Sequence, residues 1–167
     1  LAGTPDNSGS ADGIGSAASF FAPLGIVYSA PDATYPQGRL FIADNANRTI
    51  RQIDVASQAV STLAGTAGSS GSADGVGSAA RFNNLHHISY SAPDAIYPQG
   101  RLFVADATNH NIRQIDIATQ AVTTAVGQAG KQGFVPGALP GVLNTPVGVQ
   151  ATPNGLFITM RNGIVQV

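Results

Sequence analysis

The chain has 167 residues, of which 43% are hydrophobic and only 10% are charged, and its formal net charge is −1. This length suits one domain, and a near-neutral chain is a poor candidate for binding nucleic acid, which calls for a basic patch. No segment approaches the roughly 18 consecutive apolar residues of a membrane span, so none is expected.

The composition predicts an all-β protein. Glutamate is absent, Lys131 is the only lysine, and 20 glycines and 10 prolines interrupt the apolar segments. Strong helix formers are therefore scarce, while residues that favour strands and turns are abundant. Few Lys and Glu with many Ser, Ala and Gly favour an extracellular or cell-surface location.

An internal repeat determines the predicted architecture. Residues 1–62 align without a gap on residues 63–124, and 42 of the 62 positions are identical. A weaker third copy follows, in which Leu143, Pro146, Gly148 and Val149 match Phe20, Pro23, Gly25 and Ile26. In chain order, the first copy predicts strands at 24–29, 39–44, 49–55 and 59–64. Four antiparallel strands per repeat are typical of a β-propeller blade.

The repeat resembles the long form of the NHL repeat. The second copy carries ADGVGSAARF (73–82) and GRLFVADATNHNIRQI (100–115), and TLAG (62–65) closes the first. The resemblance implies propeller blades along nearly the whole chain. The sequence departs from the pattern at Leu85 and His87 in the second copy and at Met160 in the third.

The repeat also sets the expected boundaries. Blades are expected at 20–64, 82–126 and 143–167, with connecting segments at 1–19, 65–81 and 127–142. The third blade has three expected strands and lacks its outer one. Because propellers close with four to eight blades, two and a half to three blades form an incomplete ring. Further blades of the same polypeptide, or self-association, are expected to cover the open edges.

Several polar residues recur at equivalent positions, which suggests a structural role. Asp44 and Asp106 each end a strand and are expected to accept backbone N–H groups in the following turn. Arg51 and Arg113 are expected to pair with an acid or a carbonyl between blades. Asn47 begins the only Asn-x-Thr sequence and is a glycosylation candidate on an expected exposed loop.

The three histidines lie in the second copy, at His86, His87 and His110. A zinc site is one interpretation of such a group. Adjacent strand residues point to opposite faces, however, so His86 and His87 are poorly placed to share a metal. The glycine-rich loops lack the lysine of a phosphate-binding loop and the acids of a calcium loop. We therefore expect no metal and no cofactor.

Half of the differences between the first two copies fall near 21–27 and 45–49, at one end of the blade. Either exposed turns have drifted, or this rim is a binding surface on a fixed scaffold. The candidate binding residues are Arg48, Asn83, Asn84, His86, His87 and His110. The sequence thus favours a non-catalytic module that binds protein or glycan. The alternatives are a structural part of a filament or cell-surface coat, and a metal-dependent enzyme related to amidating lyases or lactonases.

Overall fold

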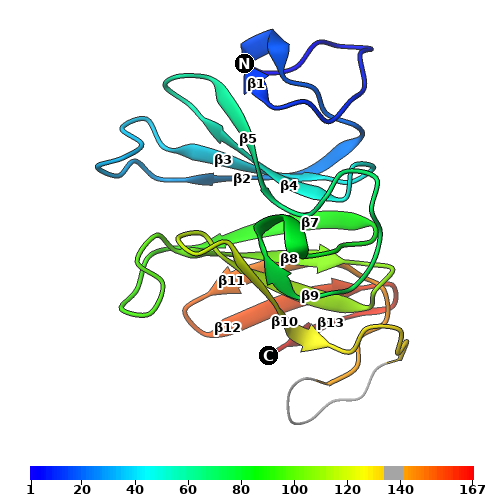
Figure 1. Ribbon diagram of the computed structural model, residues 1–167. Coiled ribbons are helices and arrows are strands. Elements are labelled where there is room, and N and C mark those ends of the chain that lie inside the picture. The colour runs from blue at the N-terminus through cyan, green and yellow to red at the C-terminus, as the bar shows by residue number, and fades with distance from the viewer. Residues whose placement is uncertain (134–140) are drawn as a thin grey trace.

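The computed structural model describes residues 1–133 and 141–167, and these residues form an all-β structure (Figure 1). The helical segments within these ranges are two 3-10 turns of three residues each, η1 (Gly15–Ala17) and η2 (Gly77–Ala79). The prediction of an all-β chain is confirmed. None of the described helical segments is long and apolar enough to cross a membrane.

Three antiparallel sheets follow one another along the chain, and we call them blades one, two and three. Blade one has the strand order β1-β5-β4-β3-β2 and blade two the order β6-β10-β9-β8-β7, whereas blade three is the meander β11-β12-β13. Blade one consists of β1 (Gly13–Ile14), β2 (Pro23–Ser29), β3 (Arg39–Asp44), β4 (Thr49–Asp54) and β5 (Ala59–Ala64). Blade two consists of β6 (Gly75–Val76), β7 (Leu85–Ser91), β8 (Arg101–Asp106), β9 (Asn111–Asp116) and β10 (Ala121–Gly127). Blade three consists of β11 (Pro146–Thr152), β12 (Gly155–Met160) and β13 (Gly163–Gln166).

The strands expected in the first copy coincide with β2 to β5 to within one residue, but the sheets of blades one and two each contain five strands instead of four. The segment before each of the first two blades contributes a two-residue strand. In the first, Gly13 pairs with Val60 on β5, and in the second, Gly75 pairs with Val122 on β10. These pairings satisfy part of the outer strand's free backbone groups, which would otherwise form an exposed edge. Residues 134–140 of the expected third connection lie outside the described residues.

The blades stack face to face, with their inner strands β2, β7 and β11 adjacent (Figure 1). One apolar cluster lies between blades one and two, and a second lies between blades two and three. In the first cluster the ring of Phe41 stacks on that of Tyr90, with centroids 6.5 Å apart. Ile26 and Ile88 lie on the innermost strands β2 and β7, as expected. The fold is therefore a sector of a β-propeller.

The inner hairpins carry two long loops on the same side of the stack, between β2 and β3 and between β7 and β8 (Figure 1, left). Each loop ends in a glycine with positive φ, which is 77° at Gly38 and 78° at Gly100. The ring of Tyr28 lies so close to Gly38 that a Cβ atom there would come within 2.6 Å of it. Glycine is required at this turn for both reasons. Blade three replaces the long loop with a short turn between β11 and β12.

Candidate functional site

A buried polar network anchors one end of blade one. The side chains of Asp44 and Arg51 are completely buried. The Oδ1 atom of Asp44 accepts a hydrogen bond from the backbone N–H of Phe21 at 2.9 Å. Its Oδ2 atom accepts from Asn47 Nδ2 at 2.8 Å and from Arg51 Nη1 at 3.0 Å. The expectation that backbone N–H groups of the following turn bond to this carboxylate is wrong, because the backbone donor is Phe21, just before the inner strand, and the turn contributes the Asn47 side chain.

The Arg51 guanidinium also holds the segment that precedes the blade. It donates to the carbonyls of Ser19 and Ala11, each at 2.9 Å, and to Asp12 Oδ1 at 2.7 Å. The ring of Phe20 lies 5.0 Å from its central carbon. The planar guanidinium suits this role because its donors have fixed directions. The acid and carbonyl partners of Arg51 thus lie in the blade itself and in the connecting segment 1–19 that precedes it.

Blade two repeats the network around Asp106. Asp106 accepts from Asn83 N at 2.9 Å, Asn109 Nδ2 at 2.8 Å and Arg113 Nη1 at 3.3 Å. Burial raises the pKa of Asp106 to about 6, and these hydrogen bonds and the Arg113 charge only partly oppose that rise. At the equivalent position blade three has Met160, which has no carboxylate.

The glycosylation candidate does not lie on an exposed loop. Asn47 is only 7% exposed, and its Nδ2 atom donates to Gly9 O at 2.6 Å as well as to Asp44. An N-linked glycan is attached through this nitrogen, which the network already uses. The expected exposure of Asn47 is therefore wrong, and we draw no glycan site from it.

Two of the three histidines connect blade two to blade three. The Nδ1 atom of His87 lies 2.9 Å from Val149 O, and His110 Nδ1 accepts from the backbone N–H of Thr145 at 3.1 Å. His86 is half-buried. Among residues 1–133 and 141–167, no three His, Cys, Asp or Glu side chains are placed to hold a metal ion.

The two variable windows form one surface on each blade. Ala46 donates to Phe21 O in blade one, and Ala107 donates to Asn84 O in blade two, both at 3.1 Å. The turns contain strained residues, because φ is 59° at Arg48 and 65° at Asn84. We call this end of the blades the variable rim, and it contains all six candidate binding residues: Arg48, Asn83, Asn84, His86, His87 and His110.

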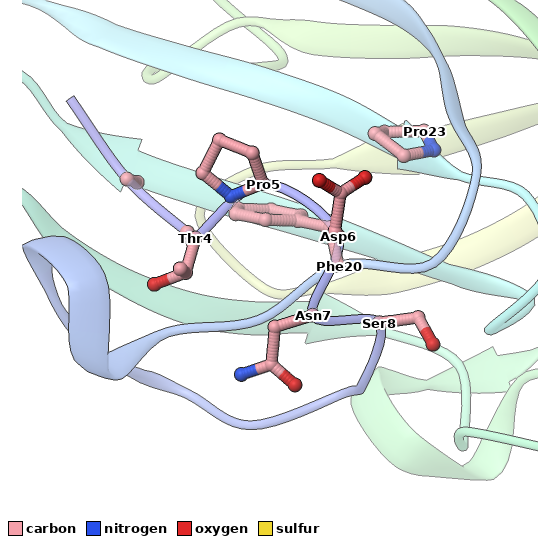
Figure 2. A pocket seen from close by; sticks show the side chains of 9 residues that line it. Thr4, Pro5, Asp6, Asn7, Ser8, Phe20 and Pro23 are labelled. Carbon is pink, nitrogen blue, oxygen red and sulfur yellow. The ribbon is translucent and has the colours of Figure 1, made fainter.

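A hollow of about 440 Å³ lies between residues 4–8 and the inner edge of blade one. Figure 2 shows this segment passing over the ring of Phe20, with Pro23 across the hollow. In the second copy the matching segment bonds to the blade before it, through Gly68 N and Asn47 O at 3.3 Å. The hollow thus lies beside a segment whose counterpart in the second copy contacts the preceding blade.

A second hollow, of about 320 Å³, lies between blades two and three. Arg101, Phe103 and Ala151 are among the residues that line it. None of the site residues predicted from the sequence is among the described residues that line it. One signal in the sequence is Ala151, which replaces the tyrosine found at Tyr28 and Tyr90 in the other two copies.

No family model matches the chain. It is 36% identical over 109 residues to Protein SUPPRESSOR OF QUENCHING 1, chloroplastic, of Arabidopsis thaliana, which covers 65% of this chain. It is 31% identical over 118 residues to NHL repeat-containing protein 2 of Bos taurus, which covers 69%. The chain spans 9% and 14% of the length of these two relatives.

Among solved structures, an auxiliary nutrient binding protein from Bacteroides thetaiotaomicron superposes with a TM-score of 0.64. It is 20% identical, and the match covers 84% of this chain and 41% of that one. Such a likeness identifies the fold alone. Together with the stacked antiparallel blades, it defines the chain as a β-propeller protein, and its sequence is similar to an NHL repeat-containing protein.

Proposed function

We propose that the chain is an NHL-type propeller segment that acts as a non-catalytic binding module at the cell surface or outside the cell. The variable rim is the surface that contacts a protein or glycan partner. The observation behind this proposal is the distribution of sequence differences. The buried Asp–Asn–Arg network is identical in blades one and two, whereas the turns that it holds differ at most positions.

A rigid frame under variable turns is how many scaffolds carry binding residues. Buried side chains hold each turn in place, because Asp44 and Asp106 accept hydrogen bonds from the backbone just before the inner strand. A partner that contacts such turns loses little binding free energy to ordering them. Arg48, Asn83 and His86 offer a cation, an amide and an imidazole, which are suited to hydrogen bonding with peptide groups or sugar hydroxyls.

The proposal can be tested with two defined panels. The chain would be biotinylated at a cysteine introduced at Ala33, in the long loop at the opposite end of blade one. It would then be presented to a printed panel of neutral and acidic oligosaccharides and to a displayed library of folded protein domains.

We expect binders whose affinity falls at least tenfold in an Asn83→Ala/His86→Ala variant. The matched control is Ile96→Ser, at the exposed tip of the opposite loop, which should leave binding unchanged. Binders that ignore the rim substitutions, or no binder in either panel, would contradict the proposal.

A further inference from the structure

The two interfaces between successive blades use equivalent strand positions, but the side chains at some of these positions differ in size. At the first interface, the ring of Tyr90 from blade two stacks on Phe41 from blade one. At the second interface, Phe103 takes the place of Phe41, and Ala151 takes the place of Tyr90. The bulged pairing of inner strands fixes this correspondence, because Tyr90 pairs with Leu102 and Ala151 pairs with Leu156.

A second large side chain is missing from the same place. Leu63 on β5 is buried in the first interface, whereas its counterpart on β10 is the half-buried Ala125. At the second interface, two alanines therefore stand where the first interface has a tyrosine and a leucine. Deleting buried groups leaves a cavity unless the surroundings collapse, and here the hollow of about 320 Å³ remains.

The second interface also leaves an arginine more accessible. Arg39, at the first interface, is 2% exposed and its Nη1 atom donates to Gln99 at 3.5 Å, from the long loop of blade two. Arg101, its counterpart, is 27% exposed because blade three has only a short turn in place of that loop. Within the described parts of the chain, the Arg101 guanidinium makes one hydrogen bond, from Nη2 to the Asp94 carboxylate at 3.3 Å.

The described pocket wall combines apolar side chains, the polar side chains of Ser91, Gln114 and Thr152, and the cation of Arg101, which is paired with Asp94. Arg101 lies over the rings of Tyr97 and Phe103, 4.3 Å and 5.6 Å from their centroids, and these contacts hold the guanidinium in place. No acidic side chain is among the described residues that line the pocket. The guanidinium geometry matches a carboxylate, which can accept two of its hydrogen bonds.

We propose that this pocket binds a small aryl carboxylate, with its ring on Phe103 and its carboxylate on Arg101. The ring takes the position that the Tyr90 phenol occupies on Phe41, so the protein contains its own example of the bound arrangement. The pocket lies at the opposite end of β7 from the variable rim. The inference is therefore independent of the proposed function.

The test uses 4-hydroxyphenylacetate as the probe and the amide spectrum of the ¹⁵N-labelled 167-residue chain as the readout. We expect saturable shifts confined to the pocket, at Phe103, Ala151 and Leu156, with a dissociation constant on the order of a millimolar or below for so small a ligand. The neutral analogue 4-methylphenol should bind at least tenfold more weakly, because it lacks the carboxylate.

Two variants separate the ring from the charge. Ala151→Tyr should fill the pocket and abolish the shifts, while its control Ala151→Ser keeps them, and Arg101→Gln should remove the preference for the acid over 4-methylphenol. If Ala151→Tyr does not fold, the Arg101→Gln comparison still decides. Shifts scattered over the surface, undiminished binding to Ala151→Tyr, or equal binding of the two probes to the unmodified chain would overturn the proposal.

Discussion

Replacing Arg113 by methionine tests how much the buried network stabilises a blade. The side chain of Arg113 is completely buried and makes four hydrogen bonds, to Asp106, Asp74 and the carbonyls of Arg81 and Ala73. Methionine fills similar space but leaves Asp106 without its cation. Removing one partner of a buried ion pair costs about 3–5 kcal/mol. Since small domains have a total stability of about 5–15 kcal/mol, this is a large fraction.

The assay is urea unfolding followed by far-ultraviolet circular dichroism. With an m-value of about 2 kcal/mol per molar, the midpoint should fall by roughly 1.5–2.5 M. Arg161→Met, at an exposed arginine, is the matched control and should change stability by less than about 0.5 kcal/mol. If Arg113→Met lost less than about 1 kcal/mol, the network would not be the anchor that we describe.

Two further predictions concern blade packing and pH. Gly25→Ala should destabilise the chain by about 1–3 kcal/mol, because the new Cβ would lie 2.5 Å from His86 O on the neighbouring blade. The control for the same unfolding measurement is Gly163→Ala, where a new Cβ would have no atom within 4 Å. Equal losses of stability in the two variants would contradict the packing of β2 on β7. The Asp106 pKa of about 6 lies above the ordinary value of 3.8, so the contribution of this group to the free energy of unfolding is full below about pH 4 and is lost as pH rises through about 6. Relative to Asp106→Asn, the unmodified chain should therefore lose up to about 3 kcal/mol between pH 4 and pH 7, and a constant difference over that range would refute the raised pKa.

The repeat made the architecture predictable. Each copy has the same short apolar strands and the same turn glycines, so the strand positions could be derived from one unit and transferred to the next. The two-residue strands β1 and β6 could not be predicted, because Gly-Ile and Gly-Val carry no periodic pattern. Their pairing depends on where the connecting segment passes the outer strand.

The candidate site was predictable only in part. The sequence identified Asp44 and Arg51 as scaffold residues, but the Arg51 partners Asp12 and Ser19 depend on the path of the connecting segment. Asn47 is buried because its amide completes the same network, which a local sequence motif cannot indicate. Gly25 and His87 occupy equivalent positions in the two copies, and blade packing explains why these residues differ. Gly25 allows close approach to β7, whereas His87 bonds to β11.

Both the variable rim and the pocket depend on the face-to-face stacking of the blades. Contacts between residues of neighbouring blades test this stacking most directly. A nuclear Overhauser spectrum of the 167-residue chain should show cross-peaks between the rings of Phe41 and Tyr90, whose centroids lie 6.5 Å apart. It should also connect the side chain of Ser89 with the amide of Ala151, which bond at 3.0 Å. Strong cross-peaks within each sheet with neither of these between the sheets would contradict the propeller arrangement.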